Sequence, residues 1–240
     1  MRLDKLLSNM GYGSRKDVKS MIKKKKVTMN GSVPRNSNLQ VDPFKDEVKV
    51  EGEQVQYRKY IYLMMHKPPG YLSATEDARD KTVIDLVPES YQHFKPHPVG
   101  RLDKDTEGLL LITNDGELTH KLLSPKKDIE KLYFAKIKGR VTEADVKKFQ
   151  EGIVLDDGYK TQPAKLTIIH SREQSEVEVT ITEGKFHQVK RMFEAVDKQV
   201  VYLKRLRMGK LILDETLRPG YIRELTEAEL NYCLYIKKNN

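Results

Sequence analysis

The sequence predicts an α+β protein with two domains: a small N-terminal helix pair followed by strands, and a larger domain with a mixed, mostly antiparallel sheet. The first observation is that strand-like and helix-like segments follow one another without the strict alternation of a parallel α/β fold. The second observation is that the positive charge is concentrated at the N-terminal end of the sequence. Residues 1–26 carry +7 of the formal net charge of +9, so a basic module is expected to precede a nearly neutral body.

Residues 1–58 are expected to form the small domain. The spacing of apolar residues predicts helices over 3–9 and 14–25, and the glycines between them allow a turn. Ser14 followed by Asp17 is typical of a capping box, with aspartate in the place usually held by glutamate.

Two hairpins are expected after the helices. Residues 26–35 have the pattern of a strand, a turn at Asn30–Gly31 and a second strand. Residues 46–55 alternate like a half-buried hairpin. Residues 56–60 are then expected to lead into the second domain, over 59–240.

The second domain mixes strands and helices in irregular order. Predicted strands lie at 60–67, 109–113, 131–139 and 175–182, and paired strands lie within 200–213. Predicted helices lie at 142–153, 187–196 and 226–238. Threonine begins the first and last of these helices as a capping residue.

The basic side chains of the N-terminal domain predict binding to a polyanion. They gather on and around the second helix, and the same residues could alternatively form a solvated face that keeps the protein soluble. The set comprises Arg2, Lys5, Arg15, Lys16, Lys19, Lys23, Lys24, Lys25 and Lys26.

Several classes of protein are excluded by what the chain lacks. The lone Cys233 cannot form an internal disulfide or a thiolate zinc site. No apolar stretch has the length of a signal peptide or a membrane span, which predicts a cytoplasmic protein without membrane contact. No glycine-rich phosphate-binding or dinucleotide-binding motif is present. We therefore expect a reaction without cofactor or metal.

One carboxylate stands out as a candidate for catalysis. Asp103 lies where an extended segment enters a turn, and Gly100 and Gly108 on either side permit close approach of a backbone or ligand. Site residues commonly occupy such places. The alternative is that Asp103 and Asp105 only cap a turn.

Two further segments carry groups that a pocket for a flipped nucleotide needs. Lys185, Lys190 and Arg191 lie near the start of a predicted helix, where amide groups also favour anions. In the strand at 131–139, Lys131 and Tyr133 share one face. A carboxylate, a cation and an aromatic ring could act on a sugar and hold its base, although surface solvation and core packing explain each residue separately.

Four ordered motifs resemble those of the RsuA-like pseudouridine synthases, which modify ribosomal RNA. They are HKPPGYLSAT, GRLDKDTEGLLLITNDG, EKLYFAKIKG and EGKFHQVKRMF. The first 31 residues resemble the small RNA-binding domain first described in a ribosomal small-subunit protein. The resemblance covers the whole chain and implies the fold expected above.

The resemblance also implies a role for individual residues. Asp103 would be the catalytic carboxylate, and Lys190 would pair with it in place of the arginine of many related synthases. Tyr133 would stack on the uracil, and Leu203 would form part of the pocket wall. Arg101 would fill the gap left by the flipped nucleotide. Among the basic residues, Lys185 and Arg191 would also contact RNA.

The implied reaction breaks the N1–C1′ glycosidic bond of uridine, turns the uracil and joins its C5 to C1′. No atoms are gained or lost, so no coenzyme or metal is needed. A carboxylate could stabilise the positive charge that develops at C1′, attack C1′, or remove the C2′ proton.

The resemblance points to one uridine of 16S ribosomal RNA as the substrate, either in naked RNA or in an assembling small ribosomal subunit. Two alternatives stay open. The enzyme could act on large-subunit RNA, or the chain could be a ribosome-assembly RNA binder without catalysis. A monomer is expected.

Overall fold

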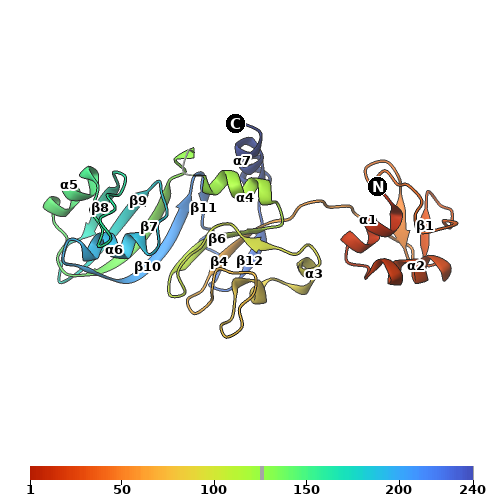
Figure 1. The fold of residues 1–240 in the computed structure, drawn as a ribbon, viewed down its shortest axis with the longest axis horizontal. Coiled ribbons are helices and arrows are strands. Elements are labelled where there is room, and N and C mark those ends of the chain that lie inside the picture. Colours follow the sequence, from red (N-terminus) through yellow and green to blue (C-terminus); the bar gives the residue numbers. More distant parts are fainter. Residues whose placement is uncertain (125–126, 240) are drawn as a thin grey trace. The chain divides into compact units, whose positions relative to one another are not determined.

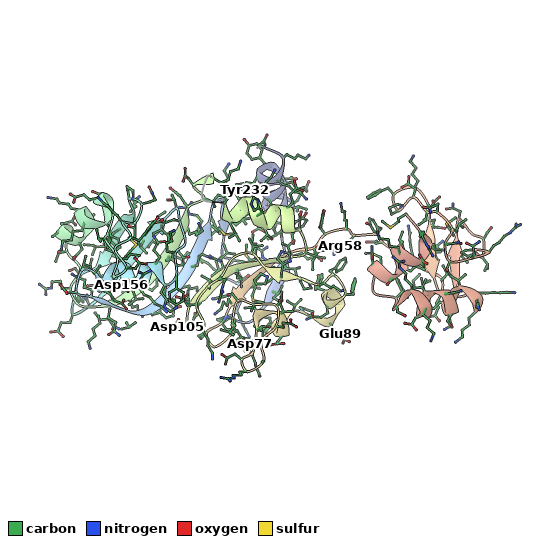
Figure 2. All side chains as sticks on the ribbon, in the orientation of Figure 1. Arg58, Asp77, Glu89, Asp105, Asp156 and Tyr232 are labelled. Carbon is green, nitrogen blue, oxygen red and sulfur yellow. The ribbon has the colours of Figure 1, made fainter. Side chains whose placement is uncertain are left out.

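The computed structural model describes residues 1–124 and 127–239 (Figures 1 and 2). The chain divides into two compact units: Met1–Ile61 together with Pro88–Pro96, and Tyr62–Val87 together with His97–Asn240. The domain boundary predicted after residue 58 stays a prediction. In the described part of the chain, no helix has the length and apolar character needed to span a bilayer.

The N-terminal unit contains the two predicted helices and a small antiparallel sheet. Its elements are α1 (Leu3–Asn9), α2 (Arg15–Lys23), β1 (Val27–Met29), β2 (Val48–Val50) and β3 (Glu53–Gln54), with strand order β1-β2-β3. The Ser14–Asp17 capping box is confirmed: each residue's side chain accepts a hydrogen bond from the other's backbone N–H. Apolar residues of both helices and the sheet form one core.

The hairpin predicted over 26–35 is confirmed in its first strand, β1, and in its turn, but its second strand is wrong. Asn30 and Gly31 make a left-handed turn, and Met29 and Ser32 form an isolated bridge across it, but the next strand in the described residues is β2. Strand β1 pairs instead with β2, and the Asn30 side chain accepts a hydrogen bond from the N–H of Glu47, just before β2. The turn is therefore tied to the later strand. The hairpin predicted over 46–55 is confirmed as β2 and β3.

The larger unit is built on one mixed sheet, which has nine strands within the described residues, in the order β12-β4-β6-β10-β7-β9-β8, with β11 beside β10 and β5 beside β6. The strands are β4 (Tyr62–Lys67), β5 (His97–Pro98), β6 (Glu107–Thr113), β7 (Lys131–Lys138), β8 (Lys165–His170), β9 (Gln174–Ile181), β10 (Gln199–Met208), β11 (Leu211–Ile212) and β12 (Ile222–Glu224). All pairs are antiparallel except β6 with β10. The predicted α+β class with a mostly antiparallel sheet is confirmed.

The helices outside the N-terminal helix pair are α3 (Glu89–Gln92), α4 (Gly116–Leu123), α5 (Glu143–Glu151), α6 (Gln188–Glu194) and α7 (Glu227–Lys238), with a short 3₁₀ turn at Val83–Leu86. Helices α4 and α7 lie together over β4 and β6 and enclose one apolar core with them (Figure 1). Helices α5 and α6 meet at the other end of the sheet, where the rings of Phe149 and Phe193 lie 4.9 Å apart. The helices predicted at 142–153, 187–196 and 226–238 are thus confirmed.

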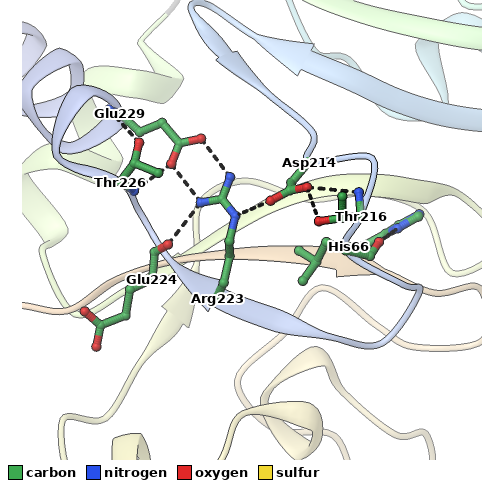
Figure 3. A network of polar contacts seen from close by, with 8 residues as sticks. His66, Asp214, Thr216, Arg223, Glu224, Thr226 and Glu229 are labelled. Atoms are coloured by element: carbon green, nitrogen blue, oxygen red, sulfur yellow. Dashed lines mark hydrogen bonds and ion pairs between the residues drawn. The ribbon is translucent and has the colours of Figure 1, made fainter.

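The C-terminal strand and helix are joined by Arg223 on β12 (Figure 3). Its guanidinium donates two hydrogen bonds to Glu229 at 2.8 and 2.9 Å and one to Asp214 at 2.7 Å. Hydrogen bonds from Thr216 and Arg223 lower the pKa of Asp214 to about 2. This network holds β12 and α7 beside β4, because the planar guanidinium can bond two carboxylates at once.

The parallel contact between β6 and β10 depends on Gly108. This residue has φ +109 and lies opposite Arg205 in the register. A Cβ added at Gly108 would lie 2.2 Å from the carbonyl oxygen of Arg205, closer than any real contact. The predicted close approach of another backbone at this glycine is therefore confirmed. It brings the loop before β6 next to the side chains of β10 and β7.

We predict that Gly108→Ala lowers the free energy of unfolding by about 2–4 kcal/mol, because it adds both an overpacked methyl group and a strained backbone. Urea unfolding measures the change. Gly116→Ala is the matched control, since a Cβ at this first residue of α4 meets no atom within 4 Å. The control is expected to leave stability unchanged or to raise it slightly. Equal losses in the two variants would contradict a special role for Gly108.

Candidate active site

An open pocket lies where the loop before β6 meets the start of α6 and the adjacent strands β7 and β10; its empty space of about 430 Å³ includes solvent at its mouth. Tyr133 comes from β7 and Leu203 from β10, and both are almost fully buried. Asp105, on the loop before β6, is labelled in Figure 2. The lining includes Arg101, Asp103, Thr106, Tyr133, Lys185 and Leu203.

The loop that carries Asp103 is fixed by hydrogen bonds from the segment after β4. The Ser73 hydroxyl donates to the Leu102 carbonyl at 2.9 Å and accepts from the Leu102 N–H at 3.0 Å. The N–H of Gly70 donates to the Lys104 carbonyl at 2.6 Å. Within the loop, the N–H of Thr106 donates to the carbonyl of Asp103 at 3.1 Å. The backbone around Asp103 is therefore held on both sides.

Lys67, at the end of β4, stabilises the same loop from beneath. Its side chain is fully buried, and its ammonium donates to the carbonyls of Thr106 at 2.8 Å, Pro68 at 3.0 Å and Lys104 at 3.3 Å. Burial lowers the pKa of Lys67 to about 8, against the opposing effect of the nearby carboxylates. The HKPPG segment thus holds the loop of Asp103 through the buried Lys67. The sequence motif alone assigned no role to a single residue of this segment.

The carboxylate of Asp103 faces two cationic or potentially cationic groups. Its Oδ2 lies 3.3 Å from the Lys190 ammonium, and its Oδ1 lies 3.5 Å from Nε2 of His187. The side chain of Asp103 is 26% exposed, so it remains open to the pocket. The structure therefore brings Asp103, Tyr133, Leu203 and Lys190 together.

Lys190 is shared between two carboxylates. Its ammonium lies 2.6 Å from Asp105, a shorter contact than the one to Asp103. Partial burial lowers the pKa of Lys190, but the hydrogen bonds and charges of both aspartates outweigh burial and raise the pKa above its ordinary value. Lys190 therefore stays charged beside Asp103.

The other predicted RNA-binding residues lie in three places. Arg101 and Lys185 line the pocket, and the Lys185 ammonium lies 4.4 Å from the centroid of the Tyr159 ring. Arg191 is held by Asp156 and Asp157 at 2.5 and 2.7 Å, outside the pocket lining. The nine basic residues within 1–26 are exposed; Arg2 pairs with Asp4 and Lys26 with Glu51. Their contacts with RNA stay predictions.

His187 and Thr106 are among the pocket residues that the sequence did not predict. His187 belongs to a quoted motif, but only its contact with Asp103 shows its position in the site. Thr106 is buried, and its hydroxyl has no hydrogen-bond partner among the described residues. A polar atom of this kind is rare in a protein interior, so it marks a place where a ligand or water could bond. No local pattern distinguishes this threonine from others.

A family profile described as RNA pseudouridylate synthase matches residues 61–195, and one described as S4 domain matches residues 1–48. The chain is 53% identical to "Uncharacterized RNA pseudouridine synthase YtzG" of Bacillus subtilis (strain 168), over 96% of this chain and 97% of the relative.

Two further relatives differ in the ribosomal subunit that their names give. "Ribosomal large subunit pseudouridine synthase B" of Bacillus subtilis (strain 168) is 39% identical over 95% of this chain and 93% of its own length. "Ribosomal small subunit pseudouridine synthase A" of Yersinia pestis is 38% identical over 96% of this chain and 97% of its own length.

A solved structure has a similar fold. The chain described as "Crystal structure of pseudouridylate synthase" superimposes with a TM-score of 0.68 at 34% identity, covering 97% of this chain and 99% of that one. Both the profile and the relatives extend over the loop of Asp103 and the strand of Tyr133. The protein therefore belongs to the RNA pseudouridine synthase family and carries an N-terminal S4 RNA-binding domain.

Proposed function

We propose that this RNA pseudouridine synthase modifies one uridine of 16S ribosomal RNA, with Asp103 as its catalytic carboxylate. The observation that carries the catalytic assignment is that Asp103 lines the pocket together with Tyr133 and has the Lys190 ammonium 3.3 Å from its carboxylate. The small subunit is favoured by the resemblance of the segment EGKFHQVKRM, in which Lys190 takes the place of an arginine. The identities to the small-subunit and large-subunit relatives are nearly equal and do not separate the two.

In the proposed mechanism, the target uridine leaves its stack and its base enters the pocket. The Tyr133 ring stacks on the uracil, and the aliphatic wall at Leu203 limits the access of water while the detached base rotates. Arg101, exposed at the pocket edge, occupies the place that the nucleotide leaves.

The bond changes balance without a second substrate. The N1–C1′ bond breaks, the C5–C1′ bond forms, C5 loses its proton to solvent, and N1 takes up one proton from solvent. Asp103 acts on the sugar, where glycosidic cleavage develops positive charge. Lys190 orients the carboxylate, since its ammonium lies 3.3 Å from Oδ2 of Asp103.

The S4 domain supplies affinity that the pocket alone does not provide. Extrusion of a nucleotide costs a few kcal/mol, and phosphate contacts elsewhere offset that cost. The exposed lysines of the N-terminal unit suit this purpose because each phosphate contact adds to affinity without reading sequence.

We predict that Asp103→Asn lowers tritium release from RNA labelled with [5-³H]uridine about a thousandfold or more, because the amide cannot act as a base or a nucleophile. Binding of RNA is expected to change less than about twofold. Asp197→Asn is the control, since Asp197 is exposed and has a left-handed backbone that asparagine accepts. A wild-type protein that binds RNA but releases no tritium would instead support a non-catalytic assembly factor.

We predict that cells without this protein lack one pseudouridine in 16S ribosomal RNA. Mapping of pseudouridines in 16S and 23S ribosomal RNA, with and without the gene, measures the difference. Return of the wild-type gene restores the modification, and return of the Asp103→Asn variant does not. Loss of a site in 23S RNA with 16S RNA unchanged would contradict the substrate proposed here.

We predict that replacing Lys23–Lys26 with glutamine weakens RNA binding and flattens its salt dependence. The slope of log K against log salt is expected to fall by about 0.7–0.9 per lost phosphate contact. The control replaces Lys147 and Lys148, exposed on α5 in the other unit, and the slopes are compared per lysine removed. If the slope changed equally per lysine in the two variants, the proposed role of Lys23–Lys26 in RNA binding would be contradicted.

A further inference from the structure

Two adjacent aromatic rings lie at the edge of the pocket, in the turn before α6. The rings of Phe186 and His187 are stacked, with centroids 3.8 Å apart and an interplanar angle of 18°. Phe186 is 75% exposed, so most of its ring is open to a ligand. The pair therefore presents an aromatic surface to solvent.

The backbone of the turn directs this surface toward the site. His187 has φ 48 and ψ 31, a left-handed conformation that a residue with a Cβ adopts at a cost. In this conformation Nε2 of His187 lies 3.5 Å from the Asp103 carboxylate, and His187 lines the pocket. Because Phe186 stacks on His187, the aromatic surface runs from the pocket to the exposed ring.

The side chains near this surface carry positive charge, which attracts the phosphates of a nucleic acid. Lys185, next to Phe186 in sequence, lines the pocket together with Arg101 and His187, so the pocket beside the aromatic pair carries two cations. Proteins that hold single-stranded nucleic acid combine cationic groups for the backbone with aromatic rings on which bases stack. A single-stranded RNA segment therefore suits this surface in both its bases and its phosphates.

We propose that Phe186 and His187 form a stacking platform for a nucleobase adjacent to the target uridine. The inference rests on the RNA pseudouridine synthase activity, because extrusion of the uridine removes a stacking partner from its neighbours. The exposed ring of Phe186 replaces that partner. The platform then lowers the cost of opening the RNA and helps to select the nucleotides that flank the target.

The test compares Phe186→Leu with Phe186→Tyr in the full-length chain. Leucine keeps the apolar character but has no aromatic face, whereas tyrosine keeps the face. With transcripts of 16S and 23S ribosomal RNA labelled with [5-³H]uridine, Phe186→Leu is expected to raise KM for the substrate transcript about five- to tenfold and to change kcat less than about twofold. Phe186→Tyr is expected to stay within about twofold of wild type in both.

Tyr235→Leu is the matched control, since Tyr235 is 66% exposed on α7 and lies outside the pocket lining. Unchanged KM in Phe186→Leu, or an equal rise in Phe186→Leu and Phe186→Tyr, overturns the platform. A fall in kcat alone also overturns it, because the side chain would then act on the chemistry and not on binding.

Direct binding separates this inference from the proposed function. Filter binding of the same transcripts gives Kd for each variant whether or not tritium is released. If the wild-type chain binds RNA but releases no tritium, the enzymatic function fails, and the ratio of Kd between Phe186→Leu and Phe186→Tyr still decides the platform.

A shortened RNA that carries the modified uridine identifies the stacked base. Removal of that one flanking base is expected to weaken binding of the wild type as much as Phe186→Leu does. It is expected to have no further effect in the variant, since both changes remove the same contact. Additive losses at both flanking positions would contradict a shared contact.

Discussion

The parallel pairing of β6 with β10 is the constraint on which the site depends. The loop of Asp103 precedes β6, whereas Leu203 lies on β10 and Tyr133 on the adjacent β7. The parallel pairing places the first residues of β6 beside the middle of β10. Because Gly108 has no side chain, the two backbones can approach each other there. Without this contact, the carboxylate and the aromatic ring would lie on separate parts of the sheet.

Buried cations support the same region through backbone carbonyls. Lys67 donates to three carbonyls below the loop, Lys131 donates to the carbonyls of Ile129 and Thr182 beside β7, and Arg205 donates to the carbonyl of Leu109. Burial lowers the pKa of Lys67 and of Lys131 to about 8, which means that keeping these charged side chains buried reduces the stability of the folded protein. Because these cations bond to backbone carbonyls, they fix the backbone without needing a carboxylate as partner. The carboxylate of Asp103 faces the pocket.

The sequence predicts most elements because the patterns of strands and capped helices are local. The alternation at 131–139 fixes which side chains of β7 are buried, and Lys131 and Tyr133 do share one face. The failure after Asn30–Gly31 has a physical cause: the turn forms, but β1 pairs with β2 and the Asn30 side chain bonds the N–H of Glu47, and no short pattern reports these contacts. The Asp103–Lys190 pair was predicted only through resemblance to a family. His187 was missed because its place in the site depends on a left-handed turn.

The division of Lys190 between two aspartates gives Asp103 a nearby positive charge and still leaves its carboxylate available to a substrate. A strong, short ion pair stabilises a carboxylate but also occupies its oxygens. Here the contact of 2.6 Å goes to Asp105, which lies mostly in solvent, and the contact to Asp103 is 3.3 Å. Lysine suits this arrangement because its ammonium is a point charge, whereas the fork of an arginine would bind both oxygens of one carboxylate. The carboxylate of Asp103 thus keeps a nearby positive charge while it remains free to meet the ribose of the substrate.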